Sequence, residues 1–107
     1  MSDVRYQPLA IALAELVEHM RSQHLWSDEK PDANALASME PFCVDTLNFE
    51  QWLQYVMVPT FMSMIESEQA LPNQCDIHPM AQQTWQQKYQ VVQGAIKVID
   101  RVISTGE

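Results

Sequence analysis

A cysteine and a histidine in the C-terminal half of the chain have a spacing that a metal site could use. Cys75 and His78 form a C-x-x-H pair, and Cys43 is available as a third ligand. A structural zinc site normally takes four ligands, which are usually supplied as two such pairs. Because the chain offers one pair, we expect loop side chains here rather than a metal site, and no cofactor is implied.

Nucleophilic catalysis by either cysteine is a second chemical option. A reactive thiol needs a positive neighbourhood that lowers its pKa. Asp45 lies close to Cys43 in the sequence, and Asp76 follows Cys75 directly. We therefore expect both thiols to be unreactive, with Cys43 serving as a small core residue between two apolar neighbours.

Paired carboxylates are a third option. Glu15 and Glu18 are three residues apart and share one face of a predicted helix. Acid–base catalysis needs a carboxyl group in a pocket that shifts its pKa. Both residues fall on the polar side of their helix, so a solvated surface is the simpler interpretation. The sequence therefore predicts a protein that is not an enzyme.

The charge balance excludes several classes of partner. Fourteen acidic and six basic residues among 107 give a net charge of −8. Nucleic acids and anionic membranes are bound mainly through Lys and Arg, so we expect neither as a direct partner. The chain has no apolar run of membrane-spanning length and does not start with a secretion signal. We expect one domain, residues 1–107, in the cytoplasm.

Two glycines, few turn signals and helical periodicity predict an all-α fold. A first helix is expected from residue 4 or 8 to residue 24, with Leu9, Leu13, Leu16 and Met20 as its apolar stripe. A short helix is expected over 32–37. A central helix is expected after an N-cap at Asn48 or, one turn earlier, at Asp45 or Thr46. We predict a kink at Pro59, which frees the Tyr55 carbonyl.

The last predicted helix begins at Pro79 and is apolar over a wide arc. Its seam repeats at intervals of four and three residues: Trp85, Tyr89, Val92, Ile96, Ile99 and Ile103. Such an arc packs against two neighbours, or leaves apolar surface for a homodimer. The predicted architecture is an antiparallel helical bundle of about four main helices.

The central block resembles the YqcC-like family, small all-helical bacterial proteins of unknown function. The resemblance covers residues from about 25 to 85 and rests on these motifs: Pro41-Phe42, Asp45-Thr46-Leu47, Gln51-Trp52-Leu53-Gln54, Val58-Pro59, Leu71-Pro72 and Pro79. Family members are similar to proteins encoded beside a tRNA pseudouridine synthase. The resemblance thus implies a helical fold and a context of tRNA modification.

These observations favour a protein-interaction or adaptor module. Tryptophan, tyrosine and methionine suit an interaction surface, although a core position is the simpler interpretation for each aromatic residue. Asp45 and Thr46 are either helix caps or partner contacts. The candidate partner surface comprises Phe42, Asp45, Thr46, Gln51, Trp52, Tyr55 and Pro59. Two alternatives remain: an accessory factor for tRNA pseudouridine modification that acts through the synthase, and a bundle that binds a small molecule.

Overall fold

The computed structural model describes residues 3–106, in which every regular element is helical. In chain order these are α1 (Tyr6–Ser22), α2 (Ala33–Leu36), the 3-10 helix η1 (Pro41–Cys43), α3 (Phe49–Trp52), the π-helix η2 (Leu53–Met57), α4 (Val58–Glu66), α5 (His78–Trp85) and α6 (Gln90–Thr105). The all-α prediction is confirmed. Within this part of the chain, no helix combines the length and the apolar character that crossing a bilayer requires.

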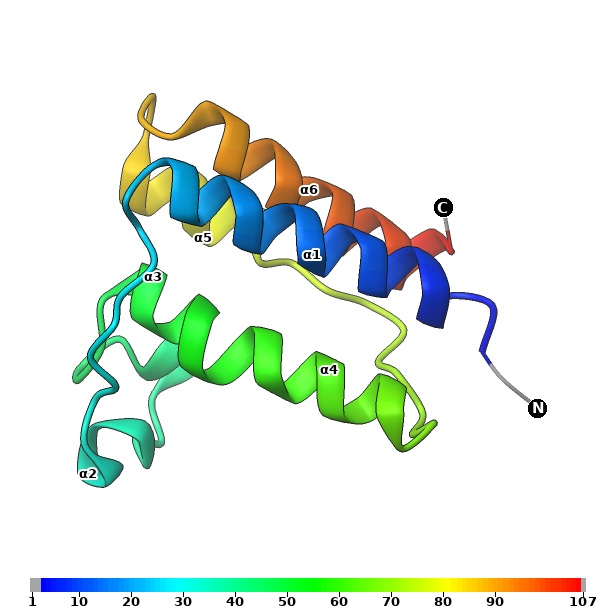
Figure 1. Cartoon of the computed structure of the whole chain (residues 1–107), viewed down its shortest axis with the longest axis horizontal. Helices are drawn as coiled ribbons and strands as arrows, with labels where there is room; N and C mark the ends of the chain where they lie inside the picture. The colour runs from blue at the N-terminus through cyan, green and yellow to red at the C-terminus, as the bar shows by residue number, and fades with distance from the viewer. Residues whose placement is uncertain (1–2, 107) are drawn as a thin grey trace.

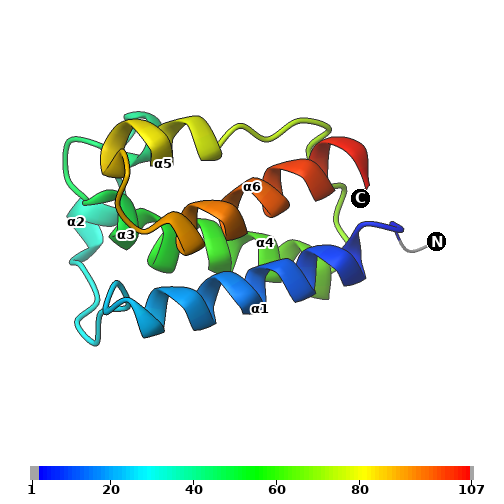
Figure 2. The same ribbon diagram turned by 90° about the horizontal axis from the view of Figure 1, so that it is seen from above.

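The longer helices alternate in direction along the chain. α1 and α6 lie side by side and antiparallel, and α5 flanks α6 on its other side (Figures 1 and 2). The continuous run of α3, η2 and α4 lies below these helices in the view of Figure 1 and contacts α1. The predicted antiparallel bundle is therefore confirmed, with the short α2 and η1 attached at one end.

The apolar stripe predicted for the first helix forms the centre of the core. Leu9, Leu13, Leu16 and Met20 are at most 1% exposed. They face Ile96, Ile99 and Ile103 of α6, which are buried to the same degree and belong to the same core cluster. Residues spaced by three and four share one helix face, so these two stripes determine how α1 and α6 pack.

The central helix is distorted in the turn that precedes Pro59. Residues Leu53–Met57 form a π-helical turn, in which the Val58 N–H donates to the Leu53 carbonyl five residues earlier. Pro59 then occupies the first turn of α4. Because the helical run is continuous, Pro59 lacks an N–H that would otherwise donate to the preceding turn, and a distorted turn is typical beside such a proline. The irregularity expected at Pro59 is thus a widened turn immediately before the proline.

The last predicted helix is two helices, so the prediction of one helix from Pro79 to Ile103 was wrong. The chain turns between α5 and α6, with φ of 54° at Gln86 and 55° at Tyr89. The buried Gln93 side chain stabilises this turn, since its Nε2 donates to the carbonyls of Gln86 at 2.9 Å and Lys88 at 2.7 Å. The sequence did not reveal this turn, because the helical spacing of apolar residues continues across it and it contains no glycine or proline.

Candidate functional site

Two residues of the candidate surface belong to an aromatic cluster that joins η1, α3 and α5. Phe42 packs edge-on against Trp52, with 4.8 Å between ring centroids. Phe49 contacts both of these rings and also Trp85, at 5.1 Å, and Trp85 in turn contacts Tyr89. Phe49 and Trp85 are buried, whereas Phe42 and Trp52 are half-buried at the edge of the cluster. The cluster attaches the η1 segment to the bundle.

Asp45 and Thr46 hold the segment around α2 against the start of the central helix. The Asp45 carboxylate accepts a hydrogen bond from the Ser38 hydroxyl, and the Thr46 hydroxyl donates to the Ala35 carbonyl at 2.7 Å. Both residues are exposed. Neither residue is the N-cap of α3, so the capping interpretation of this pair was wrong and their hydrogen bonds are tertiary instead.

Asn48 is the N-cap of α3, as one of the two sequence alternatives predicted. The Gln51 side chain reaches back, and its Oε1 accepts the Asn48 N–H at 2.8 Å. This contact satisfies a backbone donor that has no partner within the helix, which is the role of the third residue in a capping box. Gln51 therefore has a local structural contact.

Tyr55 and its neighbour Gln54 form hydrogen bonds with Ser27, in the loop that follows α1. Gln54 is 7% exposed, and its amide accepts the Ser27 N–H at 2.8 Å and donates to the Ser27 carbonyl at 2.7 Å. The Tyr55 hydroxyl donates to the same carbonyl at 3.0 Å. Sequence reasoning missed Gln54. The available signal was an amide on the apolar stripe of the central helix, three residues before Met57.

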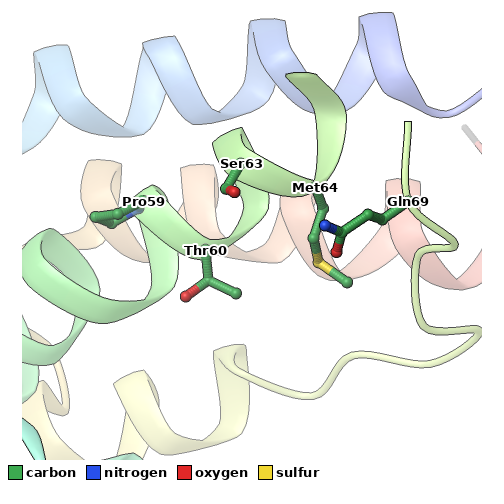
Figure 3. A pocket seen from close by; sticks show the side chains of 5 residues that line it. All are labelled: Pro59, Thr60, Ser63, Met64 and Gln69. Carbon is green, nitrogen blue, oxygen red and sulfur yellow. The ribbon is translucent and has the colours of Figure 1, made fainter. Parts of the chain in front are cut away.

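Pro59 is the exposed member of the candidate set that borders a pocket. The pocket has a volume of about 370 Å³ and lies along α4, with Gln69 of the following loop at one end (Figure 3). Its lining residues are Pro59, Thr60, Ser63, Met64 and Gln69. A second, almost entirely apolar pocket of about 250 Å³ shares Thr60 and reaches Trp52 and Cys75. The two pockets make one side of α3 and α4 concave.

The other side of α4 forms an apolar groove with α1. This α1–α4 groove has a volume of about 260 Å³ and is lined by Ala10, Leu13, Ala14, Val17, Val58 and Met62. A further hollow of about 620 Å³ follows along the same pair of helices, and its lining includes Tyr6, Gln7 and Ile65. Apolar surface therefore borders α4 on both sides.

Cys75 is surrounded by groups that suppress its reactivity. Burial raises the pKa of the thiol, and a hydrogen bond to the Asp100 carboxylate raises it further. Asp100 also accepts the backbone N–H groups of Ile77 at 3.0 Å and His78 at 2.7 Å, at the start of α5. Between residues 3 and 106, no three side chains from His, Cys, Asp and Glu are grouped as a metal would need.

Alkylation kinetics test this description of Cys75. In a Cys43→Ser background, iodoacetamide is expected to modify Cys75 at least about tenfold more slowly than glutathione at pH 8.5, because a raised pKa keeps the thiol protonated. The rate should still be rising at pH 10, and Asp100→Asn should increase it. Alkylation at the rate of glutathione by protein that remains folded would contradict this assignment.

The chain matches a family model and several known proteins. Residues 8–103 match the family model DUF446, which is described as tRNA pseudouridine synthase C. An uncharacterized protein of Haemophilus influenzae is 42% identical over 67 residues, and the uncharacterized protein YqcC of Escherichia coli is 28% identical over 69. In both cases the match covers 63% of the relative's length.

Two further matches concern an enzyme name and a fold. A protein named tRNA pseudouridine synthase C, from Pectobacterium carotovorum, is 36% identical over 61 residues, which are 57% of this chain and 16% of that protein. The solution structure of YqcC from E. coli superposes with a TM-score of 0.85 over 98% of this chain and 92% of its own, at 18% identity. At that identity the superposition supports the fold alone.

Proposed function

The chain belongs to the DUF446 family, and we propose that it is a non-enzymatic protein-interaction module that binds a partner through the exposed face of α4. The observation that carries this proposal is the apolar surface on both sides of that helix. Met62 is 37% exposed, Pro59 and Thr60 are exposed, and the adjoining pockets and groove are open to solvent. Grooves with apolar walls are the kind of surface that helical and extended peptide segments bind.

The candidate residues divide into two roles under this proposal. Trp52 and Pro59 border the concave side of α3 and α4 and are available to a partner. The remaining five have contacts within the chain that hold this surface in place: Phe42, Asp45, Thr46, Gln51 and Tyr55. Contacts that hold a surface in shape before a partner arrives lower the entropic cost of binding.

The partner we favour is a tRNA pseudouridine synthase. A segment similar to this chain makes up 16% of a protein with the name tRNA pseudouridine synthase C. Segments that occur within one protein in one organism and separately in another are often parts that associate. The net charge of −8 repels phosphate groups, so the module would act through the enzyme rather than through the RNA.

Sedimentation of purified proteins tests both levels of the proposal. We expect a stoichiometric complex when this chain is mixed at micromolar concentration with the tRNA pseudouridine synthase C of the same organism. Pro59→Arg should weaken the complex at least about tenfold, because it places a long charged side chain on the exposed face of α4. Without the enzyme, the chain should leave tRNA unshifted in a gel at physiological salt.

Val91→Arg is the matched control for Pro59→Arg. Val91, like Pro59, is an exposed apolar residue, with 55% of its surface accessible, but it lies on α6. It should leave the complex intact. Absence of any complex would refute the proposed partner. Equal weakening by both variants would refute the proposed surface, and binding of tRNA by this chain alone would contradict the role assigned to its charge.

A further inference from the structure

We infer that the α1–α4 groove is the docking site for a basic amphipathic helix of the partner. This inference rests on the proposed function. It adds a second contact, on the side of α4 opposite to the pockets beside Pro59, and it states the chemistry of the partner segment that binds there. It starts from the two hollows that α1 and α4 line together, to which α5 and α6 contribute no residue.

The two hollows follow one another along the same pair of helices, and together they are called the track. On α1 the lining passes from Tyr6 and Gln7 to Ala10, and on α4 it passes from Ile65 to Met62, in each case by one helical turn. Residues 4–17 of α1 and its approach border the track, a length of about 21 Å at 1.5 Å per residue. A partner helix of about 14 residues would match it.

The residues that line the groove suit the close approach of a helix. Ala10 and Ala14 are four residues apart on one face of α1, and their small side chains allow a second backbone to come close. Val17 and Met62 border the same floor, and Met62 is long and flexible enough to adapt to an inserted side chain. Amphipathic helices bind such grooves with apolar anchors at intervals of three and four residues.

The charge around the track indicates a basic partner. Glu18 follows Ala14 by one turn on α1, and Glu66 follows Met62 by one turn on α4, so both carboxylates lie beside the track, and both are exposed. At the end near the start of α1 the lining includes Glu68 and Asp3, and the Asp3 carboxylate is already paired with Arg5 at 2.6 Å. The charge that a partner would meet therefore comes mainly from Glu18 and Glu66. Among the described residues that line the two hollows, none is Lys, Arg or His.

The same charges disfavour a second copy of this chain as the occupant. Each copy has a net charge of −8, and a symmetric contact would bring like carboxylates together. A helix with Leu on one face and Lys or Arg on the other would place apolar anchors on the floor and cations beside Glu18 and Glu66. One such helix would therefore match both the apolar floor of the groove and the acidic residues beside it.

Binding of defined peptides tests the inference. The probe is a fluorescein-labelled 14-residue peptide of Leu and Lys, patterned as an amphipathic helix, measured by anisotropy against the whole chain. We expect saturable binding that weakens as salt is raised. Ala14→Trp should weaken it at least about tenfold by filling the groove, and the double variant Glu18→Lys with Glu66→Lys should do the same by reversing its charge.

Matched variants distinguish peptide binding in the groove from non-specific binding elsewhere on the chain. Ile11→Trp places the same side chain at an exposed position of α1 outside the lining, and Glu29→Lys with Glu40→Lys makes the same change in net charge elsewhere. Both should bind the peptide within twofold of the wild type, and a peptide of Leu and Glu should not bind. No saturable binding, or equal binding by all variants, would overturn the inference.

The synthase complex distinguishes failure of the inference from failure of the proposed function. If the enzyme binds Ala14→Trp as well as it binds the wild type, the groove is not the docking site, while the proposed partner stands. If the Leu–Lys peptide binds at the groove and the enzyme does not bind at all, the groove chemistry stands and the proposed partner falls. Thermal melts of every variant show that the chain remains folded.

Discussion

Replacing Phe49 with alanine is expected to lower the free energy of unfolding by about 3–5 kcal/mol. Phe49 is 5% exposed and contacts the rings of Phe42, Trp52 and Trp85. The substitution removes this apolar contact and leaves a cavity where η1, α3 and α5 meet. Urea unfolding followed by tryptophan fluorescence and by circular dichroism measures the change.

Two further variants control this prediction. Phe49→Leu refills much of the cavity, so it should cost clearly less than the alanine variant while losing the ring contacts. Met39→Ala removes a side chain that is 96% exposed and should change the stability by no more than about 0.5 kcal/mol. A loss below about 1 kcal/mol for Phe49→Ala would show that the aromatic cluster is not part of the cooperative core.

Gln93→Leu is expected to destabilise the protein by about 1–3 kcal/mol, although it replaces a polar residue in the core by an apolar one. Gln93 is 4% exposed, and its Nε2 donates to the carbonyls of Gln86 and Lys88. Leucine provides no donor, so the Lys88 carbonyl loses the Gln93 bond and the Gln86 carbonyl keeps only the longer contact from the Gln90 side chain, at 3.5 Å, in a turn with positive φ. Thermal and urea unfolding measure the loss.

Gln87→Leu is the matched control for the Gln93 variant. It makes the same substitution within the same turn, at an exposed position, and should change the stability by no more than about 0.5 kcal/mol. Hydrogen exchange adds a local measurement, because weakening of the turn should increase exchange at the start of α6 before the rest of that helix. Unchanged stability for Gln93→Leu would mean that the turn does not depend on this side chain.

The central segment, residues 41–59, contributes to folding as well as to the proposed binding surface. Residues 41–59 are more specific in sequence than a plain bundle requires, and most of this specificity corresponds to contacts within the chain. Thr46 binds Ala35, Gln51 caps α3, and Tyr55 binds Ser27. Substitution of these residues would therefore change folding and binding together. Exposed positions such as Ala14 and Pro59 separate the two effects.

Local physical rules acting on the sequence determined the class of fold. The spacing of Leu9, Leu13 and Leu16 defines one face of a helix, and the structure buries that face. Asn48 with Gln51 three residues later predicts a helix start, which the structure has. The short helix expected over 32–37 is present as α2, and the Asp32 carboxylate caps it by accepting the Ala35 N–H at 2.8 Å.

Tertiary contacts decided the features that no local pattern contains. The turn between α5 and α6 has no glycine or proline, and it depends on a buried amide from the following helix. Gln54 hydrogen-bonds to Ser27, which is 27 residues away in the sequence. Asp100, on α6, accepts a backbone N–H at the start of α5. The α1–α4 groove likewise exists only where two helices meet. Sequence periodicity specifies which face of a helix is apolar, whereas a buried hydrogen bond or a groove depends on which segments that face brings together.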